Sequence, residues 1–446
     1  MVFVIFSQYN DTLNTFMLIQ KSQQLLRFAL SSDAFKQSFI LTAATFFTGM
    51  IMAVAMIIAS RALGPEKFGV FSVAMSISLL FSKGLDLGLH LLIPKFYNKW
   101  IDDKTKLSQL ISQVVQWKLW LAVITLVLGL LSVQYLVSVL NYPYPLLMTF
   151  AIFGGIFASF YEYIYLILSA LHKFLWVSVL SIAQAVLKAI GFVAVFLSGV
   201  PSVSFITVAY FLPSLIVSLW LIKRFFSNVW AVPKSAPKAM RLEMFKFLKH
   251  SIFGVIAMTL IGNIDLLLVQ KYLDPLDTGI YAGATRIASL VIFVTSAIGG
   301  VLNNRAARYQ DVETLKKYLK KSWLVVAAAL IGFICFLPFA NIAIIYTIGP
   351  EYLSGYSTLI ILVFNSFLSL AIVPYISFFY GVNHPRFFSL GGIIQVLIIY
   401  LGSWFFLPEY GIIAAAISRA VATLVFGVFI STYIWYALNK LKKAEA

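Results

Sequence analysis

With 446 residues, of which 61% are hydrophobic and only 11% charged, the chain is far more apolar than a soluble globular protein, whose usual composition is about 45–50% apolar and about 25% charged. This composition excludes a soluble enzyme, a nucleic-acid-binding protein and a disordered chain, and it indicates a polytopic membrane protein. The formal net charge of +17 indicates no nucleic-acid partner, because the basic residues lie in short clusters between apolar runs, a pattern that sets membrane orientation.

Apolar runs of about 20 residues, the length that a helix needs to cross the hydrocarbon core, recur along the chain. They predict an all-α polytopic membrane protein with about twelve transmembrane helices. The predicted spans are roughly 38–60, 68–93, 117–138, 146–170, 176–198, 204–222, 251–271, 280–301, 323–346, 355–380, 387–407 and 411–437. The first apolar stretch, Met1 to Phe6, is too short for a signal peptide and has no basic residue before it.

The basic residues alternate from one loop to the next. Of the 33 Lys and Arg residues, 26 lie in the N-terminal segment, the C-terminal tail and the loops after spans 2, 4, 6, 8 and 10. Only three, Arg61, Lys67 and Lys271, lie in the loops of the other side. Since cytoplasmic loops carry the excess of Lys and Arg, we expect both termini to be cytoplasmic.

The loop after the first span is repeated after the seventh. Residues 61–71 read RALGPEKFGVF and residues 271–281 read KYLDPLDTGIY, with a constant offset of 210 that aligns Pro65 with Pro275 and Gly69 with Gly279. The repeat predicts two parallel six-helix lobes related by an axis along the membrane normal. This layout is typical of transporters that bind substrate between the lobes and expose it to each side in turn.

The expected domain organisation follows from the spans and the repeat. It comprises a cytoplasmic N-terminal segment (1–37), an N-lobe of spans 1–6 (38–222), a cytoplasmic inter-lobe loop (223–250), a C-lobe of spans 7–12 (251–438) and a cytoplasmic tail (439–446). Because the two lobes complete the unit, we expect a monomer.

Enzymatic chemistry has no sequence support. The predicted outer loops are all short, and the chain contains no H-E-x-x-H, P-loop or G-x-S-x-G motif. The single cysteine, Cys335, forms no internal disulfide and belongs to no metal motif. We therefore expect no catalytic residues, no cofactor and no metal.

Several segments resemble a known family. They are Ile58 to Leu89, Asn263 to Arg286, Gly349 to Tyr352 and Pro408 to Ile412, and in their order and spacing they are similar to the polysaccharide-transporter branch of the MOP flippase superfamily, which includes the Wzx-like O-antigen and capsule repeat-unit flippases. The resemblance extends from about residue 36 to the C-terminus. Family chains begin closer to the first span, so Met17 is an alternative start to Met1.

The resemblance implies a flippase that moves a polyprenyl-pyrophosphate-linked oligosaccharide from the inner to the outer leaflet of a prokaryotic cytoplasmic membrane. Its product would supply cell-surface polysaccharide such as the O-antigen of lipopolysaccharide. The implied partners are this lipid-linked oligosaccharide and the membrane lipids. The driving force is left open between a proton or sodium gradient and downstream consumption of the substrate.

Three other functions are alternatives to the flippase. A cation-coupled multidrug exporter of the same superfamily would favour acidic cavity residues, yet the first span, 38–60, contains no acid. An enzyme of glycan assembly would need a larger outer loop. A peptidoglycan-precursor flippase has two further spans, for which this chain has no room.

Charged residues inside the predicted spans are candidate site residues, because a charge near the bilayer centre costs about 2.5–3.5 kcal/mol. The basic ones, Lys188, Arg419, Lys83 and Arg286, are candidates for binding an anionic headgroup in the cavity. The acidic ones, Asp86, Glu162 and Asp265, are candidates for ion coupling. The slight excess of cations favours an anionic cargo.

Each of these residues also has a structural interpretation. Lys83, Asp86 and His90 share one helical face, so Lys83 and Asp86 either line a cavity or neutralise each other. Lys188 faces a wet cavity or pairs with Glu162.

Near the second repeated loop, Asp265 and Arg286 lie at similar depth on consecutive helices, and we expect them to pair. Arg419 has no acid within one helical turn, which makes it a cavity candidate.

Overall fold

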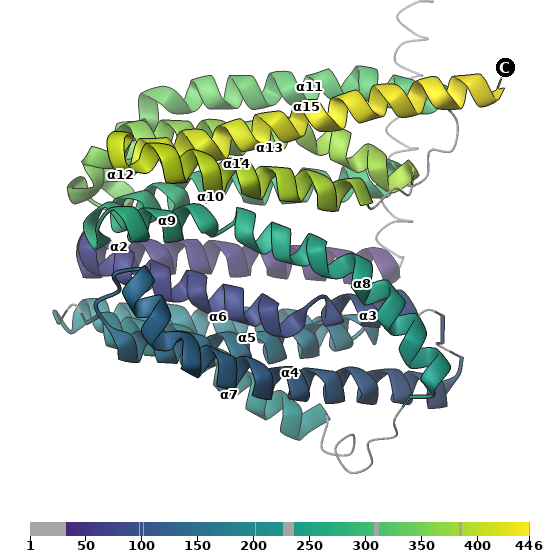
Figure 1. Ribbon diagram of the computed structural model, residues 1–446, viewed down its shortest axis with the longest axis horizontal. Coiled ribbons are helices and arrows are strands. Elements are labelled where there is room, and N and C mark those ends of the chain that lie inside the picture. The colour runs from purple at the N-terminus through teal and green to yellow at the C-terminus, as the bar shows by residue number, and fades with distance from the viewer. Residues whose placement is uncertain are drawn as a thin grey trace, which may run out of the picture.

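Long helices that run side by side make up the protein in a computed structural model, which describes residues 33–97, 99–100, 102–200, 202–225, 236–306, 312–382 and 386–445 (Figure 1). Within these residues the chain forms no β-strand. The α-helices are α2 (Asp33–Asp86), α3 (Leu92–Tyr97), α4 (Lys104–Val139), α5 (Pro145–Ala170), α6 (Phe174–Leu197), α7 (Val203–Phe225), α8 (Lys238–Ile261), α9 (Ile264–Tyr272), α10 (Pro275–Ala306), α11 (Val312–Phe336), α12 (Ala340–Thr347), α13 (Tyr356–Val382), α14 (Arg386–Tyr410) and α15 (Ile412–Glu445).

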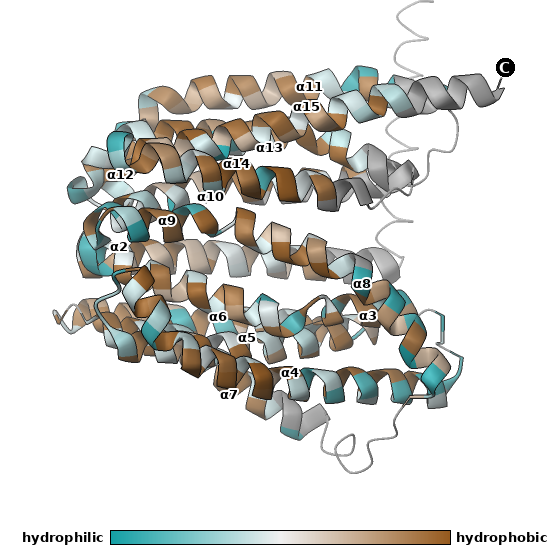
Figure 2. Ribbon diagram, in the orientation of Figure 1, coloured by the Kyte–Doolittle hydropathy of each residue, from teal (hydrophilic) through white to brown (hydrophobic). Residues whose placement is uncertain are grey.

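Among the described residues, ten helices are long and apolar enough to cross a membrane. The predicted span 38–60 and the part of 68–93 up to Asp86 lie in the single helix α2. The predicted span 280–301 lies within α10, which is not among the ten. The all-α, multi-pass architecture is thus confirmed, and the number of twelve spans stays a prediction. Figure 2 shows why the molecule suits a bilayer: apolar residues dominate the long helices, and hydrophilic residues gather toward their ends.

Helix α2 turns back on itself at Gly64 and Pro65. Gly64 has a non-helical backbone (φ 69°, ψ 172°) in the left-handed region that favours glycine, and Pro65 then begins the second half of α2 with its φ already suited to a helix. The turn lies at the left of Figure 1, in the repeated loop 61–71. We call this the outer end, after the predicted orientation, and the opposite end the inner end.

The predicted inter-lobe loop, 223–250, is more ordered than expected. Helix α7 continues to Phe225 and α8 begins at Lys238, so both ends of this segment are helical. Residues 226–235 lie outside the described residues, as do residues 1–32 of the predicted N-terminal segment, including Met17, and residue 446 of the tail. The predicted lobe boundaries remain predictions.

Helices α2–α7 form one half of the molecule in Figure 1, and α9–α15 form the other. The largest buried cluster contains residues of both halves, among them Phe68 and Phe71 of α2 and Tyr281 of α10, close to the outer end. A second cluster lies at the inner end of the first half and includes α8, and two smaller ones lie wholly in the second half. Apolar packing therefore joins the two halves mainly toward the outer end.

Candidate functional site

A lysine in the first half lies against an aromatic ring with no acid beside it. Lys188 of α6 is 8% exposed, and its Nζ atom lies 4.2 Å from the ring centroid of Tyr210 on α7. Within the described residues, Lys188 has no ion-pair partner. The ring face offsets only part of the cost of burying a cation. An anion bound beside Lys188 would therefore be strongly attracted to it. Glu162, the alternative partner for Lys188, forms an ion pair with Lys83 instead.

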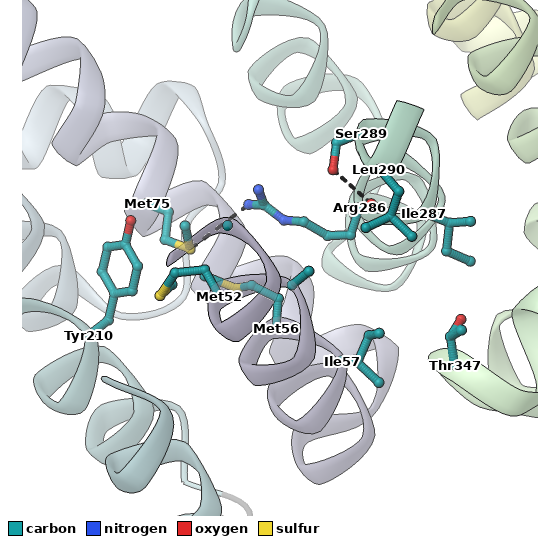
Figure 3. Close-up of a pocket in the computed structure, with 12 residues that line it drawn as sticks. Met52, Met56, Ile57, Met75, Tyr210, Arg286, Ile287, Ser289, Leu290 and Thr347 are labelled. Carbon is teal, nitrogen blue, oxygen red and sulfur yellow. Dashed lines mark hydrogen bonds between the residues drawn. The ribbon is translucent and has the colours of Figure 1, made fainter. Parts of the chain in front are cut away.

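An arginine from the second half reaches into the contact between the halves (Figure 3). Arg286 of α10 points toward α2, where its Nη2 atom lies 3.9 Å from the sulfur of Met75. Its Nε atom is buried and has no hydrogen-bond partner among the described residues. A guanidinium with an unused donor, set against a thioether, is ready to bind an incoming anion.

Tyr210 connects these two cations. Its ring carries Lys188, and it also lines a cavity of about 190 Å³ whose wall includes Arg286. Both segments of α2 contribute to this cavity, with Met52 and Met56 from before the kink and Met75 from after it. On the opposite side the cavity is lined by three further residues of α10, namely Ile287, Ser289 and Leu290 (Figure 3). The cavity is therefore at the boundary between the two halves, with cations from each half near it.

Asp265 does not form the expected pair with Arg286, and that expectation was wrong. Its Oδ2 atom accepts hydrogen bonds from Arg419 Nη1 at 2.6 Å and from the Tyr281 hydroxyl at 2.5 Å. The reason is geometric: the side chain of Asp265 faces Arg419 of α15 and Tyr281 of α10, whereas Arg286 points toward Met75 of α2. Arg419, expected to be a free cavity cation, is thus neutralised inside the second half.

Lys83 and Asp86 do not neutralise each other, which was one of the two alternatives left open for them. The Lys83 Nζ atom lies 2.5 Å from Glu162 Oε1 and 2.7 Å from Oε2, across α2 and α5. Asp86 is the last residue of α2, and its carboxylate binds His90 and Lys118 of α4, the latter at 3.0 Å.

Lys118 is the charged residue that the sequence did not reveal. It was counted with the cytoplasmic loop, yet it is fully buried. Its distance along the helix was the available signal: it lies 14 residues after the start of α4 at Lys104, which is about 20 Å along the axis.

The ion pairs use all three candidate acids but not all of the candidate cations. Each acid within the predicted spans pairs with one lysine or arginine: Glu162 with Lys83, Asp86 with Lys118, and Asp265 with Arg419. Of the candidate cations, Lys188 and Arg286 therefore stay without an acidic partner among the described residues. Lys188 lies on the ring of Tyr210, and Arg286 lines the same cavity as Tyr210. No group of three or more His, Cys, Asp or Glu side chains that would suit a metal ion occurs in the described part of the chain.

Comparisons with known proteins agree with this architecture. A family model described as a polysaccharide biosynthesis protein (Polysacc_synt) matches residues 34–302. No curated protein matches the sequence. Among solved structures, an inward-facing multidrug resistance MATE family transporter of the MOP superfamily aligns with a TM-score of 0.72 and 14% identity, over 89% of this chain and 96% of that one.

Two further structures are similar. Lipid II flippase MurJ in an inward closed conformation aligns with a TM-score of 0.73 and 12% identity, over 89% of this chain and 87% of that one. A MATE family transporter of the MOP superfamily in an outward-facing conformation aligns with a TM-score of 0.56 and 16% identity, over 93% and 98% of the two chains. These likenesses establish the fold.

Proposed function

This chain belongs to the polysaccharide biosynthesis protein family and has the fold of MOP superfamily transporters, and from that premise we propose that it is a flippase for a lipid-linked oligosaccharide. Its cargo is a polyprenyl-pyrophosphate oligosaccharide, which it moves from the inner to the outer leaflet of a prokaryotic cytoplasmic membrane for the synthesis of surface polysaccharide. Both termini are cytoplasmic in this proposal, and the two halves act as a monomer. The family and the structural relatives are transporters and flippases rather than enzymes.

The observation that carries the proposal is that two cations near the cavity between the halves have no acidic partner among the described residues. Arg286 lines this cavity, and the buried Lys188 lies on the ring of Tyr210, which also lines it. In a low-dielectric site an isolated cation is unfavourable, and an opposite charge beside it is worth far more than in water. A pyrophosphate carries two or more negative charges and would satisfy both residues at once. Arg286 would supply a fork of donors and Lys188 a point charge.

Alternating access is supported by where the two halves touch. Their shared apolar cluster lies toward the outer end. Of the clusters nearer the inner end, one belongs to the first half together with α8, and the other lies wholly in the second half. The TM-score is also higher for inward-facing and inward closed relatives than for an outward-facing one. We take the cavity to receive its cargo from the inner end, with transport requiring the outer contact to separate.

Ion coupling, if present, would involve Asp86, Glu162 or Asp265. Each of these carboxylates binds a cation, so a proton or sodium ion can be taken up only as the Lys or Arg partner moves away. Such an exchange would link ion binding to helix movement. The idea fails if Asp86→Asn and Glu162→Gln both transport normally under an imposed proton gradient.

A cation-coupled multidrug exporter is the second candidate, because a MATE family transporter has the same fold. An exporter of cationic compounds needs free carboxylates in its cavity. Here the three acids within the predicted spans, Asp86, Glu162 and Asp265, are all paired, whereas Lys188 and Arg286 have no acidic partner among the described residues. The charge of the cavity therefore favours an anionic cargo over a cationic drug.

The test is lipid mass spectrometry on membranes from a strain depleted of the protein. We expect a polyprenyl-pyrophosphate oligosaccharide to accumulate and surface glycan to fall. Expression of the wild-type chain should reverse both changes, and the Lys188→Gln variant, produced at equal level, should not. An unchanged lipid-linked pool together with hypersensitivity to cationic drugs would overturn the flippase in favour of the exporter.

A further inference from the structure

Helix α8 begins with three turns that lie on the inner end of the first half. Met240, Met244 and Leu248 recur every four residues and are 7%, 0% and 6% exposed. They pack into the cluster that contains Phe96 of α3 and Trp100. This stretch is therefore an amphipathic helix with its apolar stripe fixed on the protein.

The opposite face of the same turns combines positive charge with exposed apolar side chains. At 3.6 residues per turn, the side chains of Lys238, Arg241, Leu242, Phe245 and Lys249 share an arc of about 100°. All five are exposed, Leu242 by 54% and Phe245 by 59%. We call this set, with the adjacent Lys246, the α8 basic face.

No acid interrupts the α8 basic face. Glu243, the acidic residue within these turns, projects to the side and forms an ion pair with Lys99. The four basic side chains themselves have no hydrogen-bond or ion-pair partner within the described part of the chain. The positive charge is thus fully available to a partner outside the protein.

The position of α8 relative to the bilayer indicates what kind of partner its basic face binds. The helix continues without a break from Lys238 through an apolar run to Ile261, a candidate membrane span. Its first turns therefore lie where the span leaves the hydrocarbon core, at the level of the lipid headgroups. A helix with basic residues beside exposed Leu and Phe at this level is typical of binding to anionic membrane surfaces.

We propose that the α8 basic face binds anionic phospholipids of the leaflet at the inner end, with Leu242 and Phe245 inserted between the lipid chains. The bound lipid holds the first turns of α8 beside the first half. The later turns of α8 pack on the second half, where Ala257 contacts Gly392 of α14. Anionic lipid is thereby attached to the helix that links the two halves. This inference does not depend on the identity of the cargo.

The test measures the depth of Phe245 in the bilayer. The only cysteine, Cys335, is exposed, so Cys335→Ser provides a background in which Phe245→Cys carries a nitroxide. The full chain is placed in nanodiscs of phosphatidylcholine alone or with phosphatidylglycerol. Collision of the nitroxide with oxygen reports the bilayer, and collision with a nickel chelate reports water.

We expect phosphatidylglycerol to reduce nickel collision several-fold and to raise oxygen collision at this position. Arg241→Gln/Lys249→Gln should abolish that response. The matched control is Lys320→Gln/Lys321→Gln, which removes the same charge from two exposed lysines of α11 and should leave the response intact.

Other outcomes would overturn the inference. If the nitroxide stays open to nickel in both lipids, the face is free for a soluble partner instead. If it is shielded equally in both lipids, apolar contact suffices and anionic headgroups have no role. If the α11 control loses the response as well, the effect is one of net charge and not of the α8 basic face.

Discussion

Gly69 and Gly279 face each other where the two halves meet at the outer end. A Cβ atom on Gly69 would lie 2.1 Å from the carbonyl oxygen of Pro275, and one on Gly279 would lie 1.7 Å from that of Pro65. The two glycines occupy equivalent places in the repeated loops, so the contact is reciprocal. Only hydrogen at both positions allows the backbones of α2 and α10 to approach this closely.

The first prediction concerns this contact. Gly69→Ala or Gly279→Ala should push the two halves apart, because the obstructing atoms belong to backbone that cannot rotate away. Overpacking of this kind costs about 1–3 kcal/mol, so the melting temperature and transport should both fall. Gly84→Ala on the same helix is the control, since a Cβ there meets nothing within 4 Å. Normal transport by both variants would show that the close contact is dispensable.

The second prediction concerns Arg61, which closes the outer end in another way. Its guanidinium donates hydrogen bonds to the carbonyl oxygens of Ile345, Tyr346 and Thr347, at 3.0, 2.5 and 2.5 Å. These are the last carbonyls of α12, where a cation also interacts favourably with the helix dipole. Arg61→Gln removes the bonds and the charge, and Arg61→Lys keeps the charge alone.

We expect Arg61→Gln to populate the outward-open state. The reporter is Thr278→Cys in the Cys335→Ser background, because Thr278 is fully buried at the outer end of α10. Its labelling by an impermeant maleimide should rise in Arg61→Gln, and to a smaller degree in Arg61→Lys. Lys271→Gln, which removes one charge from the repeated loop of the other half, should leave labelling unchanged. Equal labelling in all variants would show that the hydrogen bonds of Arg61 to α12 do not hold the outer end closed.

The third prediction separates the structural ion pairs from the free cations. Asp265→Asn leaves Arg419 buried without its counter-charge, and breaking a buried pair in this way costs about 3–5 kcal/mol. The double variant Asp265→Asn/Arg419→Gln removes both charges and should recover much of that loss in thermal unfolding. Lys83→Gln is the comparison: its pair with Glu162 is 22% and 33% exposed, so a smaller loss is expected. If the double variant melts at as low a temperature as Asp265→Asn, the Arg419–Asp265 pair stabilises the fold by more than neutralising two buried charges.

Hydropathy and charge predicted the class of protein and the helical fold, because each span carries its own apolar signal. The ion pairs were harder to predict. Lys83 and Glu162 are 79 residues apart, and Asp265 and Arg419 are 154 apart. Sequence spacing identifies neighbours on one helix and says nothing about which faces of two distant helices meet.

The errors were therefore systematic. Asp265 was expected to pair with Arg286 because both lie near one hairpin, and a pair between Lys83 and Asp86 was one alternative because both lie on one helix. The structure instead pairs each acid with a cation from another helix. Because Arg419 pairs with Asp265, it is no longer part of the candidate site, which keeps Lys188 and Arg286.

The last prediction follows from their isolation. A buried cation without a counter-charge destabilises the folded state, and evolution retains such a residue in a membrane protein mainly for function. Lys188→Gln and Arg286→Gln should therefore keep or raise the melting temperature of the purified protein while surface glycan is lost. Arg419→Gln provides the contrast, because it leaves the buried Asp265 without its counter-charge and should lower the melting temperature. A fall in melting temperature for Lys188→Gln as large as that for Arg419→Gln, or full surface glycan in both Lys188→Gln and Arg286→Gln, would show that these cations do not bind the cargo.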